Sequence, residues 1–351
     1  MDAPGTARSG SPMSRPTGQP VPLVFLFGLN DTVRELVRIR PNNQPQIVLQ
    51  GTASFENHLT PGRFLKKTIW LDGLPRAQRV RVPAGGLINY IADPDSHGNA
   101  LAKAGRIADS VSRPCFNPPR LVAETRRDQV ADRLSAIDGL RVPRTVRLAP
   151  KHPRDFVEAM RAHGLSYPVI VRLAGDHGGV STVRVERPDG WDAIHQLPWG
   201  GRSVYLTEFV DYRDADGLFR KHRIAMVRGR GLLRHVIIGS TWLLHRSERL
   251  EGARYVDEED QRLRRFEDEA LGNIRPTLQR IHEKIGLDYY GIDCHLADDG
   301  TLTLFEVNAT MNILHNQRSP NRWDEPCARI RESLEQALIR HVERSVGQEA
   351  G

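Results

Sequence analysis

Short apolar runs separated by polar or glycine-rich segments predict alternating strands and helices in the first third of the chain. Residues 21–27 form a continuous apolar run, which is typical of a buried strand. Asp31 follows it and can cap a helix, so we expect a helix over residues 32–40. Further strands are expected over residues 46–49, 68–71 and 87–91, and a helix over residues 99–110. This alternation favours a small open α/β sheet.

The rest of the chain predicts mixed α+β segments. An amphipathic helix is expected over residues 125–137, with Val130, Leu134 and Ile137 on its apolar face. Later helices are expected over residues 153–162, 191–196, 258–285 and 324–345, and strands over residues 167–173, 181–186, 203–210, 222–227 and 232–239. The predicted fold class is α/β and α+β, with domains over residues 21–115, 116–210 and 211–345 after a disordered tail over residues 1–20.

A hairpin within residues 290–312 carries the chemically most informative side chains. Asp299-Gly300 between two β-rich runs predicts a tight turn, which places Asp298 opposite Thr301. The same register places Asp293 directly opposite Glu306, with Asn308 on the same face. Like charges that face each other are destabilising unless something neutralises them, and oxygen ligands of this kind suit Mg²⁺.

The alternative for this hairpin is a solvated turn region with scattered acids. We favour the metal site because Leu302 and Leu304 are expected to share the face of Glu306, which predicts that this face is at least half buried.

Three further segments are candidates for binding a nucleotide. Arg172 ends a predicted strand and precedes a glycine loop with Gly178 and Gly179, whose backbone amides can approach phosphate, although such a loop is often only a hairpin. The segment Glu208-Phe209-Val210 can contact adenine and Asp211 can hold ribose hydroxyls, but taken alone this segment is more typical of an ordinary strand end. Lys221 stands just before the strand expected over residues 222–227 and Arg223 lies within it, so both share a face that suits phosphate or carboxylate. The alternative is a solvated basic edge of the sheet.

Composition and charge restrict the class of protein. The chain has 351 residues, 39% hydrophobic, which allows two or three domains. The longest apolar run is shorter than the ~20 residues of a membrane span, and the first twenty residues lack the apolar segment of a secretory signal. Three cysteines without metal-ligand spacing indicate a reducing compartment, so we expect a cytoplasmic protein without a membrane partner. The net charge of +7 is spread along the chain, which does not indicate nucleic-acid binding but favours anionic small substrates.

These motifs, in this order, resemble the ATP-grasp superfamily, which includes D-alanine–D-alanine ligase and glutathione synthetase. Asp293 with Glu306-Val307-Asn308 matches the metal-binding acid and the Glu-x-Asn pair of that superfamily. The resemblance covers roughly residues 115–315 and is closest to bacterial ATP-grasp proteins rather than to a named ligase. It departs from the usual pattern where Arg172 and Gln129 stand in place of lysines.

The resemblance implies a three-domain fold with ATP bound between the central lid and the C-terminal domain. It further implies Mg²⁺ on Asp293, Glu306 and Asn308, phosphates on Arg172 and the glycine loop, and Arg223 beside the transferring group. The implied reaction activates a small-molecule or peptide carboxylate as an acyl phosphate and joins it to an amine. A kinase with a stable acceptor and a nucleotide-binding regulatory module without turnover remain the alternatives. The substrates and the oligomeric state do not follow from the sequence.

Overall fold

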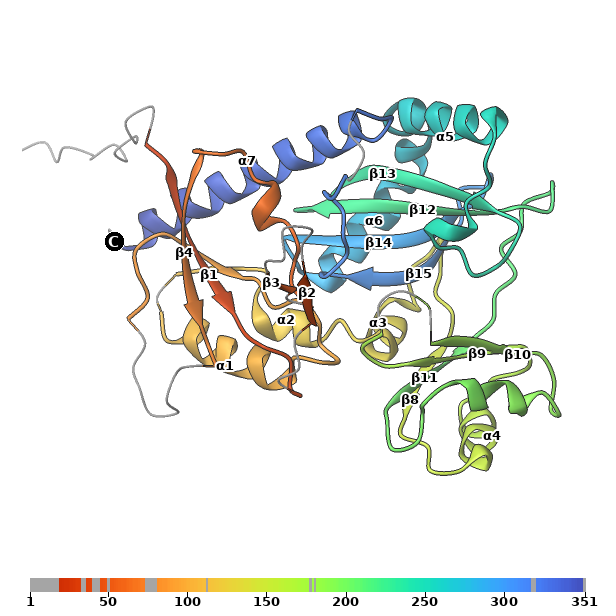
Figure 1. Ribbon diagram of the computed structural model, residues 1–351. Helices are drawn as coiled ribbons and strands as arrows, with labels where there is room; N and C mark the ends of the chain where they lie inside the picture. Colours follow the sequence, from red (N-terminus) through yellow and green to blue (C-terminus); the bar gives the residue numbers. More distant parts are fainter. Residues whose placement is uncertain are drawn as a thin grey trace, which may run out of the picture.

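The computed structural model describes residues 19–32, 36–39, 45–48, 51–72, 81–111, 113–176, 179, 181–316 and 320–349. Three main sheets and a long C-terminal helix organise these residues (Figure 1). The predicted tail lies almost wholly outside the described residues. Within them, Cys115, Cys294 and Cys327 form no disulfide, and no helix combines the length and the apolar character that crossing a membrane requires.

The first sheet is the small open α/β sheet that the apolar pattern predicts. Its strand order is β4 (Phe64–Trp70), β1 (Val21–Phe27), β5 (Gly86–Asn89) and β6 (Cys115–Phe116), and neighbouring strands are parallel. The side chains from Leu23 to Phe27 are all buried, which explains the uninterrupted apolar run. Helix α1 (Gly98–Asp109), close to its expected bounds, connects β5 to β6.

The prediction of a helix over residues 32–40 is wrong in its described part. Leu36–Ile39 is strand β2, which pairs with β3 (Pro45–Val48) in an antiparallel ladder. Its Leu, Val and Ile residues favour a strand, and a partner strand close in sequence satisfies the backbone groups that a helix would otherwise satisfy internally. An aspartate that can cap a helix was therefore insufficient evidence for one.

The second sheet is antiparallel and has a hydrophobic core of its own. Its order is β10 (Thr182–Val185), β9 (Val169–Leu173), β11 (Val204–Glu208) and β8 (Thr145–Leu148). Helix α4 (Pro153–Ala162), confirmed at its predicted bounds, and the 3₁₀ turn η2 (Trp191–Gln196) cover one face. Figure 1 shows α4 on the side away from the third sheet, so the opposite face is turned towards that sheet.

The third sheet contains the predicted hairpin. Its order is β13 (Arg230–Gly239), β12 (Phe219–Val227), β14 (Tyr289–Leu296), β15 (Leu302–Asn308) and β7 (Leu140–Arg141). The helix expected over residues 258–285 is instead divided into α5 (Ala253–Arg265), a π-helical segment (Phe266–Ala270) and α6 (Leu271–Ile285). Helix α6 also tolerates Pro276 in its interior, where the missing backbone N–H weakens a regular helix.

The hairpin keeps the predicted acidic pair but has a different turn. Ala297, and not Asp298, is hydrogen-bonded opposite Thr301, at 3.0 Å, and Gly300 has a φ of +85°. The longer loop places Cys294 opposite Leu304, and a bulge at the next residue of β15 restores the pairing of Asp293 with Glu306. Strand alternation then puts Leu304 on the face opposite to Glu306, so the expectation that they share a face is wrong.

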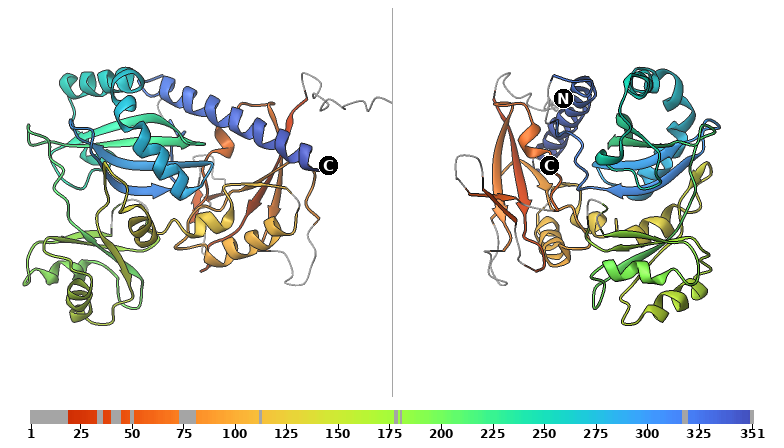
Figure 2. Two further views of the ribbon diagram at one scale, coloured as in Figure 1. Left: turned by 180° about the vertical axis from the view of Figure 1, so that it is seen from behind. Right: turned by 45° about the vertical axis from the view of Figure 1, so that its right-hand side comes forward.

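Helix α7 (Asp324–Glu349) joins the first and third sheets into one body. It packs against β1 and β5 on one side and against β12 and β13 on the other (Figures 1 and 2). Glu335 of this helix is buried and accepts hydrogen bonds from the segment before β4, from Thr60 N at 2.6 Å and from Arg63 Nη1 at 2.6 Å. The first and third sheets therefore share one hydrophobic cluster, whereas the second sheet has a separate one.

Candidate functional site

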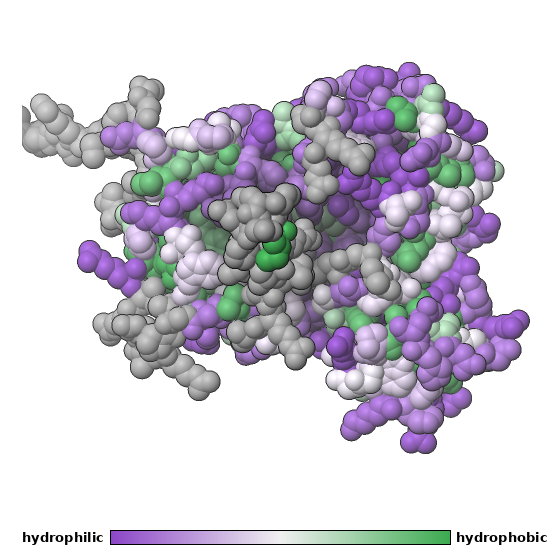
Figure 3. Space-filling model, in the orientation of Figure 1, coloured by the Kyte–Doolittle hydropathy of each residue, from purple (hydrophilic) through white to green (hydrophobic). Residues whose placement is uncertain are grey.

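A cleft of about 400 Å³ lies between the second and third sheets. Its walls come from α3 (Arg127–Leu134), the second sheet, strands β12, β14 and β15, and the segments around residues 242–245 and 308–312. Eight of the predicted site residues line it: Arg172, Glu208, Phe209, Val210, Arg223, Asp293, Glu306 and Asn308. On the face seen in Figure 3, hydrophobic residues appear only in small separated groups among hydrophilic ones.

Asp293 is a buried carboxylate that two neighbouring cations keep ionised. Its side chain is 5% exposed, and Arg223 donates to its two oxygens at 2.8 and 2.9 Å. Lys221 Nζ lies 3.7 Å from Oδ2. Burial alone would raise the pKa of Asp293, but Arg223 and Lys221 outweigh burial and hold that pKa well below its ordinary value.

Glu306 is also paired with a cation, from a different element. Arg127 Nη2, at the start of α3, lies 2.5 Å from Glu306 Oε1. Asn308 Nδ2 donates to the same oxygen at 2.9 Å, and Asn308 Oδ1 accepts from Thr310 N at 2.6 Å. The facing carboxylates are thus neutralised by arginine and lysine side chains in this structure.

The donor set nevertheless fits a hard divalent cation. Asp293 and Glu306 are directly paired across two strands, Asn308 lies two residues further along β15, and all three line one cleft. Carboxylate and amide oxygens are the ligands that Mg²⁺ prefers. Among the described residues, no group of three or more His, Cys, Asp or Glu side chains has a metal-binding arrangement, and the predicted set contains only two such side chains.

Cations outnumber carboxylates at this end of the cleft. Arg127, Arg172, Lys221 and Arg223 line it together with Asp293 and Glu306. Burial, reinforced by the charge of Arg127, lowers the pKa of Arg172 to about 10. Burial, with Arg223 adding to it, also lowers the pKa of Lys221. A further negative charge beside these cations would offset both their burial and their mutual repulsion.

The glycine loop of the second sheet approaches a histidine of the third-sheet body. Gly179 has a φ of +73°, and a Cβ on it would overlap the ring of His245, so only glycine fits there. Burial, and after it the charge of Lys221, lowers the pKa of His245. The Nε2 atom of His245 is buried without a hydrogen-bond partner. Arg172 donates to the carbonyl of Asp176 in the same loop. Gly178 lies outside the described residues.

The cleft lining also includes apolar residues, and the predicted adenine segment is among them. The rings of Phe209 and Trp242 meet edge-to-face at 5.8 Å, and the Arg184 guanidinium lies 4.5 Å from the centre of the Phe209 ring. Glu208 accepts from Arg144 N at 3.2 Å, and Phe209 N donates to Pro168 O at 3.3 Å. These contacts fix the backbone of the segment beside the cleft.

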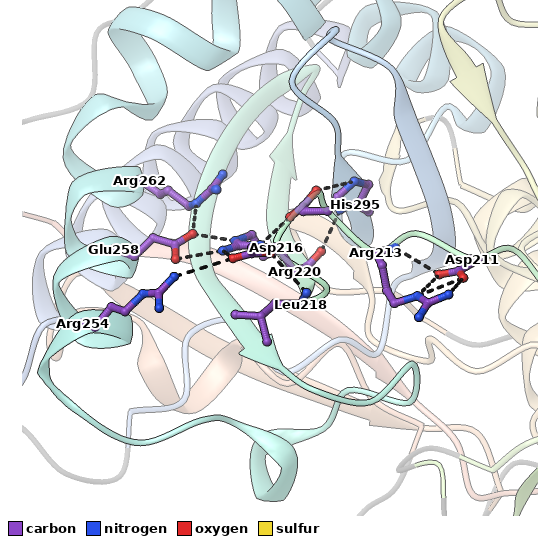
Figure 4. Close-up of polar contacts among 10 residues, drawn as sticks. Asp211, Arg213, Asp216, Leu218, Arg220, Arg254, Glu258, Arg262 and His295 are labelled. Carbon is purple, nitrogen blue, oxygen red and sulfur yellow. Dashed lines mark hydrogen bonds and ion pairs between the residues drawn. The ribbon is translucent and has the colours of Figure 1, made fainter.

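Two charged residues near the motifs are engaged elsewhere. Asp211 does not line the cleft, and its carboxylate accepts from Arg213 Nε at 3.0 Å (Figure 4). Arg220 does not line the cleft and pairs with Asp214 at 2.7 Å. It also pairs with Asp216 and Glu258, at 2.8 and 2.6 Å (Figure 4). The basic run on β12 is therefore divided by strand alternation into a cleft face and a structural face.

Three residues that line the cleft, Arg127, Trp242 and His245, are not among the predicted site residues. Arg127 lies in the helix expected over residues 125–137, of which only the apolar face was assigned a role, and Trp242 and His245 belong to a segment without a recognisable pattern. The only available signal was the position of Arg127 at the start of a helix that precedes a motif segment. Trp242 and His245 reach the cleft through the path of the chain after β13, which periodicity does not predict.

Comparisons with known proteins identify the architecture. No family model and no curated protein sequence matches the chain. The D-alanine–D-alanine ligase from Bacillus anthracis superposes with a TM-score of 0.51 at 13% identity, covering 94% of this chain and 100% of that one. The same enzyme complexed with ATP gives 0.50 at 12% identity, covering 94% and 99%. The VanG D-Ala:D-Ser ligase from Enterococcus faecalis gives 0.53 at 12% identity, also covering 94% and 99%.

Proposed function

Because this chain has the ATP-grasp fold, we propose that it binds Mg·ATP in the cleft between its second and third sheets and joins a carboxylate to an amine. The observation that carries the proposal is the meeting of Asp293, Glu306 and Asn308, from the third sheet, with Arg172, from the second. Structural neighbours that are ligases, one of them complexed with ATP, support the same type of reaction.

The two ends of the cleft would hold the two ends of the nucleotide. Adenine would lie in the apolar part of the cleft, beside the contacting rings of Phe209 and Trp242, with Glu208 beside its exocyclic amine. The outer phosphates would lie at the cationic end, where Arg172 and Lys221 can neutralise them. Asp293, Glu306 and Asn308 would hold Mg²⁺, which supplies charge neutralisation on the β- and γ-phosphates.

The chemistry needs positioning and charge stabilisation more than a nucleophilic side chain. A substrate carboxylate oxygen attacks the γ-phosphorus, the bond to ADP breaks, and an acyl phosphate forms. The amine then attacks the acyl carbon, phosphate leaves, and the nitrogen loses a proton to give the amide. Arg223, which holds Asp293 in the free protein, would orient the transferring phosphoryl group or the substrate carboxylate.

Hydroxylamine tests this proposal, because it converts an acyl phosphate into a hydroxamate. The protein is incubated with Mg·ATP and a panel of carboxylates, and ADP release is measured with and without hydroxylamine. We expect a carboxylate that stimulates ADP release to yield its hydroxamate. A stable phosphorylated product without hydroxamate would instead show a kinase. ATP binding without any substrate-stimulated ADP release would indicate the regulatory module.

A further inference from the structure

Arg127 occupies a position in the cleft that its sequence context does not explain. It is the first residue of α3, and its side chain is 20% exposed. Besides Glu306, its guanidinium contacts the backbone of β15, where Nη1 donates to Phe305 O at 3.1 Å. Arg127 thus connects helix α3 to the acidic hairpin.

The neighbours of Arg127 show that it also belongs to the phosphate end. Its charge is the main cause, after burial, of the lowered pKa of Arg172, so the two guanidinium groups lie close enough to repel each other. Gln129, two residues on, offers no charge, and its Oε1 is buried without a partner. Among the described residues of α3, Arg127 is the one cation that lines the cleft.

The pairing with Glu306 conflicts with metal binding. Glu306 Oε1 already accepts from Arg127 and from Asn308, so a cation that uses this oxygen must replace the guanidinium. A displaced guanidinium needs another anion, since a buried and unpaired arginine is strongly unfavourable. A nucleotide phosphate in the cleft would provide that anion.

We propose that Arg127 is an exchanging phosphate ligand: it neutralises Glu306 in the free protein and moves to the nucleotide phosphates when Mg·ATP binds. This inference rests on the proposed function, because it assumes that the cleft takes a magnesium nucleotide. Its specific consequence is that metal alone binds poorly, since it cannot supply Arg127 with a new partner. Removal of Arg127 should therefore affect metal and nucleotide in opposite directions.

The test uses the full-length chain and its Arg127→Met variant. Mn²⁺ binding without nucleotide is measured by electron paramagnetic resonance, and Mg·ATP binding by calorimetry. In the variant we expect Mn²⁺ alone to bind about tenfold more tightly than in the wild type and Mg·ATP about tenfold more weakly. Arg126→Met is the matched control, because Arg126 precedes the same helix but pairs with Asp128, at 3.2 Å, and does not line the cleft.

The outcomes separate this inference from the proposed function. A wild-type protein that binds no Mg·ATP contradicts the proposed function itself. A wild type that binds Mg·ATP, together with an Arg127→Met variant that binds Mn²⁺ and Mg·ATP as the wild type does, overturns the role of Arg127 alone. Should the Met variant not fold, Arg127→Lys serves instead. Lysine lacks the planar two-pronged donor of arginine, so Mn²⁺ should again bind more tightly and Mg·ATP more weakly, by a smaller factor than in Arg127→Met.

Discussion

The guanidinium of Arg223 donates to both carboxylate oxygens of Asp293 across the β12–β14 pair, at 2.8 and 2.9 Å. This pairing allows a carboxylate to remain ionised at 5% exposure. In a cleft that also contains Arg127, Arg172 and Lys221, the same cation is available to an incoming phosphate. If the proposed function holds, ion pairs between these side chains would be exchanged for contacts to Mg·ATP when the nucleotide binds.

The first prediction concerns the metal. Glu306→Gln removes one charge and almost no volume, so it should abolish metal-dependent nucleotide binding without unfolding the protein. Calorimetry with ATP in the presence and absence of Mg²⁺ measures the effect. Glu283→Gln, on the exposed side of α6, is the control and should bind as the wild type does. Unchanged Mg·ATP affinity in Glu306→Gln would remove the metal assignment.

The second prediction places Arg172 at the outer phosphates. Arg172→Ala should weaken ATP binding by about tenfold to a hundredfold and AMP binding much less, because charged hydrogen bonds to phosphate are lost. Competition of ATP, ADP and AMP against a fluorescent nucleotide measures the three affinities. Arg187→Ala is the control, since Arg187 is 74% exposed and pairs only with Asp189 among the contacts described. Equal weakening of ATP and AMP would place Arg172 elsewhere.

The third prediction concerns the base. Trp242→Ala should weaken ATP, ADP and AMP by one common factor, because it removes an aromatic contact of about 1–3 kcal/mol and no phosphate contact. The same competition measurement applies. Trp70→Ala on β4, 47% exposed and outside the cleft, should leave all three affinities unchanged. A loss confined to ATP would contradict an adenine contact.

The elements that local patterns define well were predictable from the sequence. Helix α4 has its predicted bounds because a proline in its first turn and an apolar stripe agree on them. The pairing of Asp293 with Glu306 was also predicted, although it arises through a longer loop and a compensating bulge. The loop is longer than predicted and β15 contains a bulge that was not predicted. These two departures compensate each other, so Asp293 and Glu306 still face each other.

The features that the sequence did not predict depend on contacts between residues that lie far apart in the chain. Leu36–Ile39 is a strand because Pro45–Val48 pairs with it, which overrides a plausible helix start. The sequence gives Arg127 no partner, and only the packing of α3 against β15 shows that it meets Glu306. The position of Arg127 at the start of a helix does not reveal its partner, because its surroundings are supplied by another part of the chain.

The fourth prediction concerns stability in acid. Burial, with the charge of Arg262 adding to it, lowers the pKa of His222 from 6.5 to about 3. The unfolded chain therefore binds a proton below pH 6.5 that the folded chain does not bind until about pH 3, and the free energy of unfolding falls as the pH drops through this window. At about pH 5 this histidine alone lowers that free energy by about 2 kcal/mol relative to neutral pH.

Urea unfolding at neutral and acidic pH tests this effect. His222→Phe keeps an aromatic ring but cannot titrate, so its free energy of unfolding should fall less between the two pH values than that of the wild type. The control is His195→Phe at an exposed position, which should keep the wild-type pH dependence. Identical pH dependence in His222→Phe and the wild type would show that His222 is not held neutral.

A crystal structure with Mg²⁺ and a non-hydrolysable ATP analogue tests the central claim most directly. We predict the nucleotide between the second and third sheets, with its base beside Phe209 and Trp242 and its outer phosphates on Arg172 and Lys221. The metal should contact Asp293 and Glu306, with Arg127 moved from Glu306 to a phosphate oxygen. A nucleotide bound outside this cleft, or a metal held by other side chains while Asp293 and Glu306 keep their arginine partners, would contradict the account.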